Sequence, residues 1–253
     1  MRHFISFKEM NIARHIPNTV TSMNLLCGVL GVISVFNGRQ DIAFCLMLAA
    51  AAFDFLDGFA ARALGAYSAI GKELDSLADM VSFGLLPSVM LHCLMQEMSS
   101  GADIWSYVPL LIVIFSALRL AKFNVDERQS ENFIGLATPA CAMLCGSLAY
   151  YISRDPDSFL TRWAEGFVFI PVLSVVLSVL LVSEIPMFSM KFKKNVQKGT
   201  PIYKMRVFLM GWTAVSILLV WILGLNWSMI VILVFTLYII MNLVNAAVTA
   251  GSK

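Results

Sequence analysis

Residues 54–79 read Asp54-Phe-Leu-Asp57-Gly58-Phe-Ala-Ala61-Arg62, then eight residues, then Gly71-Lys-Glu-Leu-Asp75-Ser-Leu-Ala-Asp79. Four aspartates therefore stand between two strongly apolar runs. A carboxylate at the centre of a membrane helix costs about 2.5–3.5 kcal/mol. Acids kept at such a place need a partner, and a divalent cation is the obvious one.

The spacing of the four aspartates predicts where their side chains point. Asp54 and Asp57 are separated by three positions, and Asp75 and Asp79 by four, so each pair shares one helix face. If the residues between them reverse the chain, the two pairs face each other. Four hard oxygen ligands suit Mg²⁺ or Mn²⁺, and we expect two ions.

The small and basic residues beside the aspartates point to a phosphate ligand. Gly58 has no side chain, so a ligand can approach the helix backbone there. Ala61 is small on the same side, and Arg62 offers a planar fork that fits phosphate oxygens. The chemistry that these residues imply is a diphosphate held by metal ions.

The pattern D-x-x-D-G-x-x-A-R-x₈-G-x-x-x-D-x-x-x-D resembles the signature of the CDP-alcohol phosphotransferase family, and every fixed position is met. The resemblance implies an enzyme that takes its lipid from a CDP-linked donor. It assigns Gly58, Ala61, Arg62 and Gly71 to the CDP-lipid site, together with Asp57. It also implies a homodimer.

The composition indicates a membrane protein with several spans. Of 253 residues, 59% are hydrophobic and 13% are charged, and the mean hydropathy is +0.80. These values exclude an ordinary soluble domain, and we expect membrane lipids and no nucleic acid as partners. The five cysteines lie in apolar runs without a CxxC pair, which favours small buried residues over disulfides or a zinc site.

Apolar runs predict an all-α bundle of about eight transmembrane spans, each near the ~20 residues that a span requires. The bundle divides into a basic juxtamembrane segment, a six-span core, a basic cytoplasmic loop and a C-terminal two-span hairpin. The juxtamembrane segment is either an interfacial helix or a solvated tail. These four parts are residues 1–16, 17–183, 184–206 and 207–253; the spans are 18–37, 41–62, 75–97, 105–123, 134–152, 164–183, 207–224 and 227–247.

The basic residues predict the orientation of the spans. With the N-terminus inside, 15 of the 18 Lys and Arg residues fall in cytoplasmic segments, and Arg39, Arg154 and Arg162 fall outside. Positive charge concentrates on the cytoplasmic side of membrane proteins. We therefore expect both termini and the aspartates at the cytoplasmic face of the inner membrane.

A polar stripe opens the first span, where Asn18, Thr21 and Asn24 recur every three residues after Pro17. Proline in the first turn, with Asn or Thr as a cap, also explains these residues as the start of a helix. A similar P-N-x-x-T element in the family faces the nucleotide phosphates. The resemblance therefore assigns Asn18 and Thr21 to the CDP-lipid site.

Two further segments bear on the acceptor alcohol. L-R-L-A-K-F-N at 118–124 and F-x-G-L-x-T-P at 133–139 resemble the bacterial type II phosphatidylserine synthases, as does the stretch 75–87. That branch more often has Arg at the place of Lys122. The resemblance spans about residues 12–182 and implies L-serine as the acceptor. Its candidate site residues are Ser82, Arg119, Lys122, Asn124 and Thr138.

The charge of this region also bears on the acceptor. Arg119 lies about one turn inside the membrane, where an unpaired cation is costly. With Lys122 and Arg128 it makes a sparse basic set, which favours zwitterionic serine. Glycerol 3-phosphate and inositol phosphate would each call for a denser cluster of basic residues, but both remain alternatives.

The reaction that these assignments predict starts with the diphosphate of CDP-diacylglycerol held by Asp54, Asp57, Asp75 and Asp79 through metal ions. Asp79 is the predicted general base for the serine hydroxyl, and CMP leaves. Cation-coupled transport is a rival function, because intramembrane acids also mark ion pathways. The acids here cluster at one membrane face, which favours the enzyme, and a purely structural role does not explain the matched motif.

Overall fold

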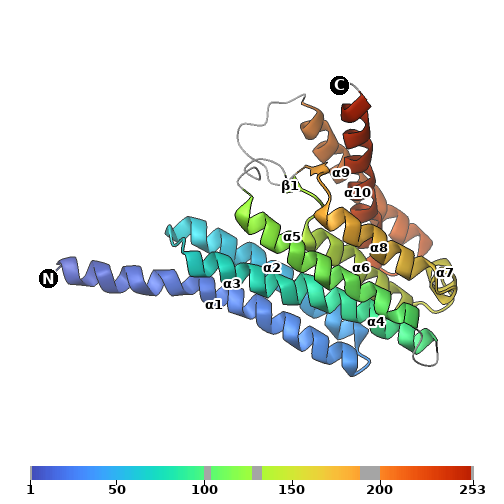
Figure 1. Cartoon of the computed structure of the whole chain (residues 1–253), viewed down its shortest axis with the longest axis horizontal. Helices are drawn as coiled ribbons and strands as arrows, with labels where there is room; N and C mark the ends of the chain where they lie inside the picture. Colours follow the sequence, from blue (N-terminus) through green and yellow to red (C-terminus); the bar gives the residue numbers. More distant parts are fainter. Residues whose placement is uncertain (1, 100–103, 127–132, 189–199, 252–253) are drawn as a thin grey trace.

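The computed structural model describes residues 2–99, 104–126, 133–188 and 200–251, and it is built almost entirely of helices (Figure 1). The first half comprises α1 (Arg2–Phe36), α2 (Gln40–Leu64), α3 (Ala69–Asp79), the π-helical η1 (Met80–Leu85), α4 (Leu86–Met98), the 3₁₀-helical η2 (Ile104–Leu110) and α5 (Leu111–Val125). The second half comprises β1 (Phe133–Ile134), α6 (Thr138–Arg154), α7 (Phe159–Glu165), α8 (Phe169–Val182), β2 (Pro186–Met187), α9 (Pro201–Leu223) and α10 (Ser228–Gly251).

Six helical segments of the described chain are long and apolar enough to cross a membrane. A seventh candidate is the pair α7 and α8, which is bent by 91°. The predicted span at 134–152 corresponds to α6, whose 17 residues fall short of a typical span. The multi-pass, all-α architecture is therefore confirmed, and the count of eight spans stays a prediction. The six segments are His15–Phe36, Gln40–Leu64, Ala69–Met98, Ile104–Val125, Pro201–Leu223 and Ser228–Thr249.

The first helix begins well before the first predicted span. α1 runs without interruption from Arg2 to Phe36 and contains Pro17. Its N-terminal part projects beyond the bundle in Figure 1. Residues 2–16 of the predicted juxtamembrane segment are thus helical and continuous with the span that follows. Residues 189–199 of the basic loop, including Lys191, Lys193 and Lys194, lie outside the described residues, as does Arg128.

A short turn reverses the chain between α2 and α3. Gly65 ends α2 in the left-handed conformation, at φ 59°, where glycine is favoured. The Ser68 side chain then caps α3 by accepting a hydrogen bond from the backbone N–H of Gly71 at 2.9 Å. The turn brings the face that carries Asp57 opposite the face that carries Asp75, as the sequence predicted.

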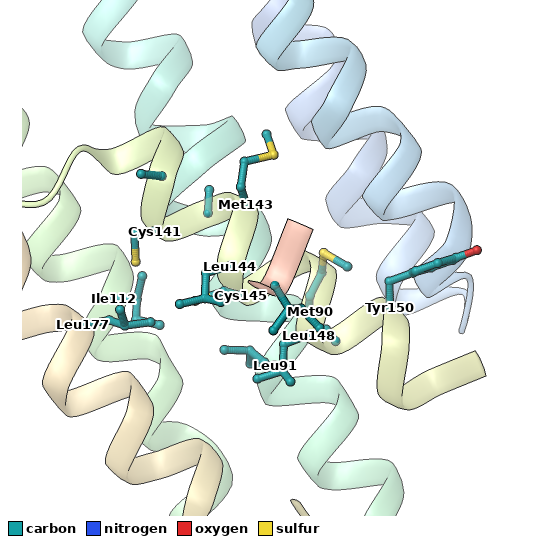
Figure 2. Close-up of a cluster of buried hydrophobic side chains, with 14 of the residues drawn as sticks. Met90, Leu91, Ile112, Cys141, Met143, Leu144, Cys145, Leu148, Tyr150 and Leu177 are labelled. Carbon is teal, nitrogen blue, oxygen red and sulfur yellow. The ribbon is translucent and has the colours of Figure 1, made fainter. Parts of the chain in front are cut away.

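Helix α6 lies at the centre of the apolar core. In Figure 2 its side chains, among them Leu144 and Leu148, lie among side chains of α4, α5 and α8, including Met90, Ile112 and Leu177. These five side chains are buried. Dense packing of this kind holds the helix ends in fixed positions, and the candidate site is built at those ends.

Candidate active site

Three carboxylates converge where α2 meets α3. One oxygen from each of Asp54, Asp57 and Asp75 can be chosen so that all three lie within 4.8 Å of one another. Asp57 is buried, whereas Asp54 and Asp75 are half-buried. Three acidic oxygens at this separation can surround one divalent cation, and oxygen ligands of this kind suit Mg²⁺ or Mn²⁺. The residues therefore fit the metal that the sequence predicts.

A hydroxyl from α1 supports one of these carboxylates. Thr21 Oγ1 donates a hydrogen bond of 2.6 Å to Asp57 Oδ2, and both side chains are buried. A hydrogen-bond partner behind a metal-binding carboxylate fixes its orientation. Thr21 was predicted to contact the CDP-lipid, and the structure adds a direct contact with a candidate metal ligand.

Asp79 lies outside the three-carboxylate group. It is buried at the end of α3, and its Oδ1 accepts a hydrogen bond of 3.2 Å from Asn24 Nδ2. Its role as a fourth ligand stays a prediction. Asn24 belongs to the polar stripe of α1, which marked the residue as polar but did not indicate its partner. The π-helical turn η1 starts directly after Asp79, and such turns are frequent at functional sites.

A cavity of about 220 Å³ adjoins the carboxylates at the same end of the bundle. Every residue predicted for the CDP-lipid site lines this cavity, as does Asp75. The predicted residues are Asn18, Thr21, Asp57, Gly58, Ala61, Arg62 and Gly71. Tyr67, Ser68 and Lys72 line it as well, although no pattern in the sequence pointed to them. The cavity thus has acids on one part of its wall and exposed cations, Arg62 and Lys72, on another. This arrangement fits a ligand that carries phosphates.

Two glycines shape this cavity. A Cβ on Gly71 would lie 2.9 Å from Ser68 Oγ and 3.0 Å from Asn18 Oδ1, so a side chain there would displace these two polar groups from the cavity wall. A Cβ on Gly58 would lie 3.4 Å from a terminal guanidinium nitrogen of Arg62. That separation is an ordinary van der Waals distance, so the guanidinium lies beside the helix face at Gly58.

The predicted acceptor residues separate into distinct groups. Arg119 and Thr138 are both buried, and Arg119 Nη1 donates a hydrogen bond of 3.1 Å to Thr138 Oγ1. Arg119 Nε is also buried and has no hydrogen-bond partner among the described residues. The buried Ser82 hydroxyl instead donates to the backbone oxygen of Asn24 at 2.9 Å, which joins η1 to α1.

Lys122 and Asn124 make contacts away from Arg119. Lys122 Nζ forms an ion pair with Glu184. Asn124 links α5 to α3, because its Nδ2 donates to Ser76 Oγ at 3.0 Å and its backbone oxygen accepts from Lys72 Nζ at 2.9 Å. The structure thus brings Arg119 and Thr138 together and gives Lys122 and Asn124 partners on other segments.

Comparison with known proteins matches residues 14–182 to the family described as CDP-alcohol phosphatidyltransferase. The archaetidylserine synthase of Methanothermobacter thermautotrophicus is 32% identical over 176 residues, which are 67% of this chain and 68% of that protein. The CDP-diacylglycerol–serine O-phosphatidyltransferase of Bacillus subtilis is 31% identical over 191 residues, 73% of this chain and 97% of that protein. The Mycobacterium leprae protein of the same name is 35% identical over 183 residues, which span 58% of its length and 69% of this chain.

Proposed function

The chain belongs to the CDP-alcohol phosphatidyltransferase family, and we propose that it transfers the phosphatidyl group of CDP-diacylglycerol to the hydroxyl of L-serine, giving phosphatidylserine and CMP. The observation that carries the proposal is the group of three carboxylates, two of which, Asp57 and Asp75, line a cavity that Arg62 also lines. The names of the relatives in Bacillus subtilis and Mycobacterium leprae support serine as the acceptor.

The nucleotide end of the donor occupies the cavity in this proposal. Asp54, Asp57 and Asp75 would hold Mg²⁺ or Mn²⁺, with two ions as the predicted number. Metal bound there would offset the charge of the diphosphate and orient it. The guanidinium of Arg62 binds a phosphate oxygen and stabilises the negative charge that develops on the departing CMP. Asn18, Gly58, Ala61 and Gly71 shape the wall against which the nucleotide lies.

Asp79 acts as the general base in the chemical step. Its carboxylate accepts the proton of the serine hydroxyl while the serine oxygen bonds to the phosphorus that carries diacylglycerol. The bond from that phosphorus to the CMP oxygen breaks, and CMP leaves with the electron pair. The hydrogen bond from Asn24 holds the Asp79 carboxylate in one orientation. The Arg119 guanidinium, held by Thr138, binds the carboxylate of serine.

The placement in the cell follows from the distribution of charge along the chain. The bias of Lys and Arg supports both termini and the site at the cytoplasmic face of the inner membrane. A cytoplasmic, water-soluble acceptor reaches the site from that side. The family resemblance supports a homodimer.

An acceptor panel tests the proposal. Purified protein in detergent is incubated with CDP-diacylglycerol, Mn²⁺ and one of four acceptors: serine, glycerol 3-phosphate, inositol or inositol phosphate. We expect CMP and phosphatidylserine with serine alone, and no product after chelation. A product from another acceptor would reassign the substrate. Absence of CMP release with every acceptor would overturn the proposed activity and favour the rival transporter.

A further inference from the structure

The last two helices lie outside the matched family region, yet α10 contacts a segment next to the acceptor residues. We call this segment the clasp and define it as residues 133–136 together with residues 185–188. Within it, β1 and β2 pair antiparallel, with Ile134 opposite Pro186. Figure 1 shows β1 at the end of the bundle where α5 also terminates, and β2 contacts α10.

Two buried side chains of α10 fix the second half of the clasp. Asn242 Oδ1 accepts a hydrogen bond of 2.9 Å from the backbone N–H of Phe188, and the Tyr238 hydroxyl donates one of 3.1 Å to the backbone oxygen of Phe188. Asn242 Nδ2 donates to the backbone oxygen of Tyr238 at 2.7 Å. The rings of Tyr238 and Phe188 pack edge to face, with centroids 5.1 Å apart. Both backbone polar groups of buried Phe188 therefore have side-chain partners on α10.

The clasp connects these residues to Thr138 through backbone hydrogen bonds. The N–H of Gly135 donates to the oxygen of Ile185 at 2.9 Å, and the N–H of Leu136 donates to the oxygen of Leu180 at 2.9 Å. Gly135 has φ 76°, and a Cβ there would lie 2.7 Å from the oxygen of Leu181, so the backbone fits closely against the end of α8. Thr138 follows two residues after Leu136.

Next to Thr138, the guanidinium of Arg119 has an N–H group with no hydrogen-bond partner among the described residues. Arg119 is 7% exposed, donates to Thr138 through Nη1, and has no hydrogen-bond partner at Nε among the described residues. Buried polar groups are normally satisfied, so this nitrogen points to an anionic ligand that arrives with the substrate. Asp79, the predicted base, lies near enough to Arg119 for their opposite charges to attract.

We propose that Tyr238 and Asn242 are positioning residues for the acceptor: by fixing the clasp, they hold Thr138 and Arg119 where the acceptor carboxylate binds. The inference rests on the proposed function. Neither residue touches the reacting atoms, so their loss is expected to act on acceptor binding more than on binding of the CDP-lipid. The C-terminal hairpin thereby contributes to the selection of the acceptor.

Steady-state kinetics with serine and CDP-diacylglycerol varied in turn test the inference. Tyr238→Phe removes one hydroxyl and keeps the ring, and we expect the KM for serine to rise about three- to tenfold with the KM for CDP-diacylglycerol within about twofold. Asn242→Leu is also expected to raise the KM for serine. The double variant is expected to fall short of the product of the two single effects, because both act on one peptide. Thr236→Val, an isosteric change on the same helix, is the control.

Thermal unfolding in detergent identifies variants that have lost their fold. If Asn242→Leu does not unfold cooperatively, the kinetics of Tyr238→Phe alone test the inference. Equal shifts of both KM values, or a fall in kcat with unchanged KM for serine, would overturn the inference. Wild-type protein that makes no phosphatidylserine would overturn the proposed function instead. The two failures are therefore distinguishable.

Discussion

Replacing Thr21 with valine removes one hydroxyl from beside Asp57 and keeps the shape of the side chain. The Thr21 oxygen lies 2.6 Å from Asp57 Oδ2 and 3.0 Å from the backbone oxygen of Pro17. A hydroxyl has a single proton, and the shorter contact to the charged group is the stronger bond. The substitution therefore removes a buried hydrogen bond to a candidate metal ligand.

The expected magnitude follows from the type of bond that is lost. A hydrogen bond to a charged group contributes about 1.5–3 kcal/mol. Each 1.4 kcal/mol is about a tenfold change in an equilibrium constant. Loss of a partner behind a metal ligand typically weakens metal binding by about 10- to 100-fold. We expect the dissociation constant for Mn²⁺ to rise within that range in Thr21→Val.

Electron paramagnetic resonance of free Mn²⁺ during a titration measures this constant, and the Mn²⁺ dependence of CMP release gives a second estimate. Thr19→Val is the matched control, because Thr19 Oγ1 donates only within its own helix, to the oxygen of His15 at 2.9 Å. Equal effects of Thr21→Val and Thr19→Val on Mn²⁺ binding would refute the reasoning that Thr21 supports a metal-binding Asp57.

Three further predictions concern the base, the metal and the packing of α1. Asp79→Asn is expected to abolish phosphatidylserine formation while binding of CDP-diacylglycerol stays within a few-fold of wild type; retained turnover would reject Asp79 as the base. Chelation is expected to stop CMP release, and added Mn²⁺ or Mg²⁺ to restore it; turnover that persists in a chelator would argue against a metal. Gly28→Ala is expected to cost about 1–3 kcal/mol, seen as a lower unfolding midpoint in detergent, because the new Cβ would lie 3.0 Å from backbone atoms of Ser82. Gly211→Ala meets nothing within 4 Å and is the control; an equal loss there would point to a general helix effect.

The site could be predicted well from sequence where its geometry is local. Asp54 and Asp57 share a face because of their spacing, and the structure confirms that Asp75 faces them. The reversal that brings them together depends on Gly65 and Ser68, whose residue types are typical of a helix end and a helix cap. The stretch 54–79 thus contains both the acids and the turn that gathers them, although Gly65 and Ser68 are not fixed positions of the motif.

Contacts between distant segments could not be predicted from one sequence. Asn24 approaches Asp79 across 55 positions, and its place in a polar stripe gave no indication of that partner. Lys122, which was predicted for the acceptor site, pairs with Glu184 62 positions away, and its role in acceptor binding stays a prediction. Such pairs depend on how whole helices pack, which residue spacing within a helix does not determine. The π-helical turn after Asp79 likewise has no local signature in the stretch 80–85.

The most direct test of the account is the anomalous diffraction of Mn²⁺ in crystals of the protein grown with CDP-diacylglycerol. We predict a peak between the carboxylates of Asp54, Asp57 and Asp75, with the donor's diphosphate against the same peak. A bound nucleotide with no metal between it and these three side chains, or a metal held elsewhere in the chain, would contradict the account.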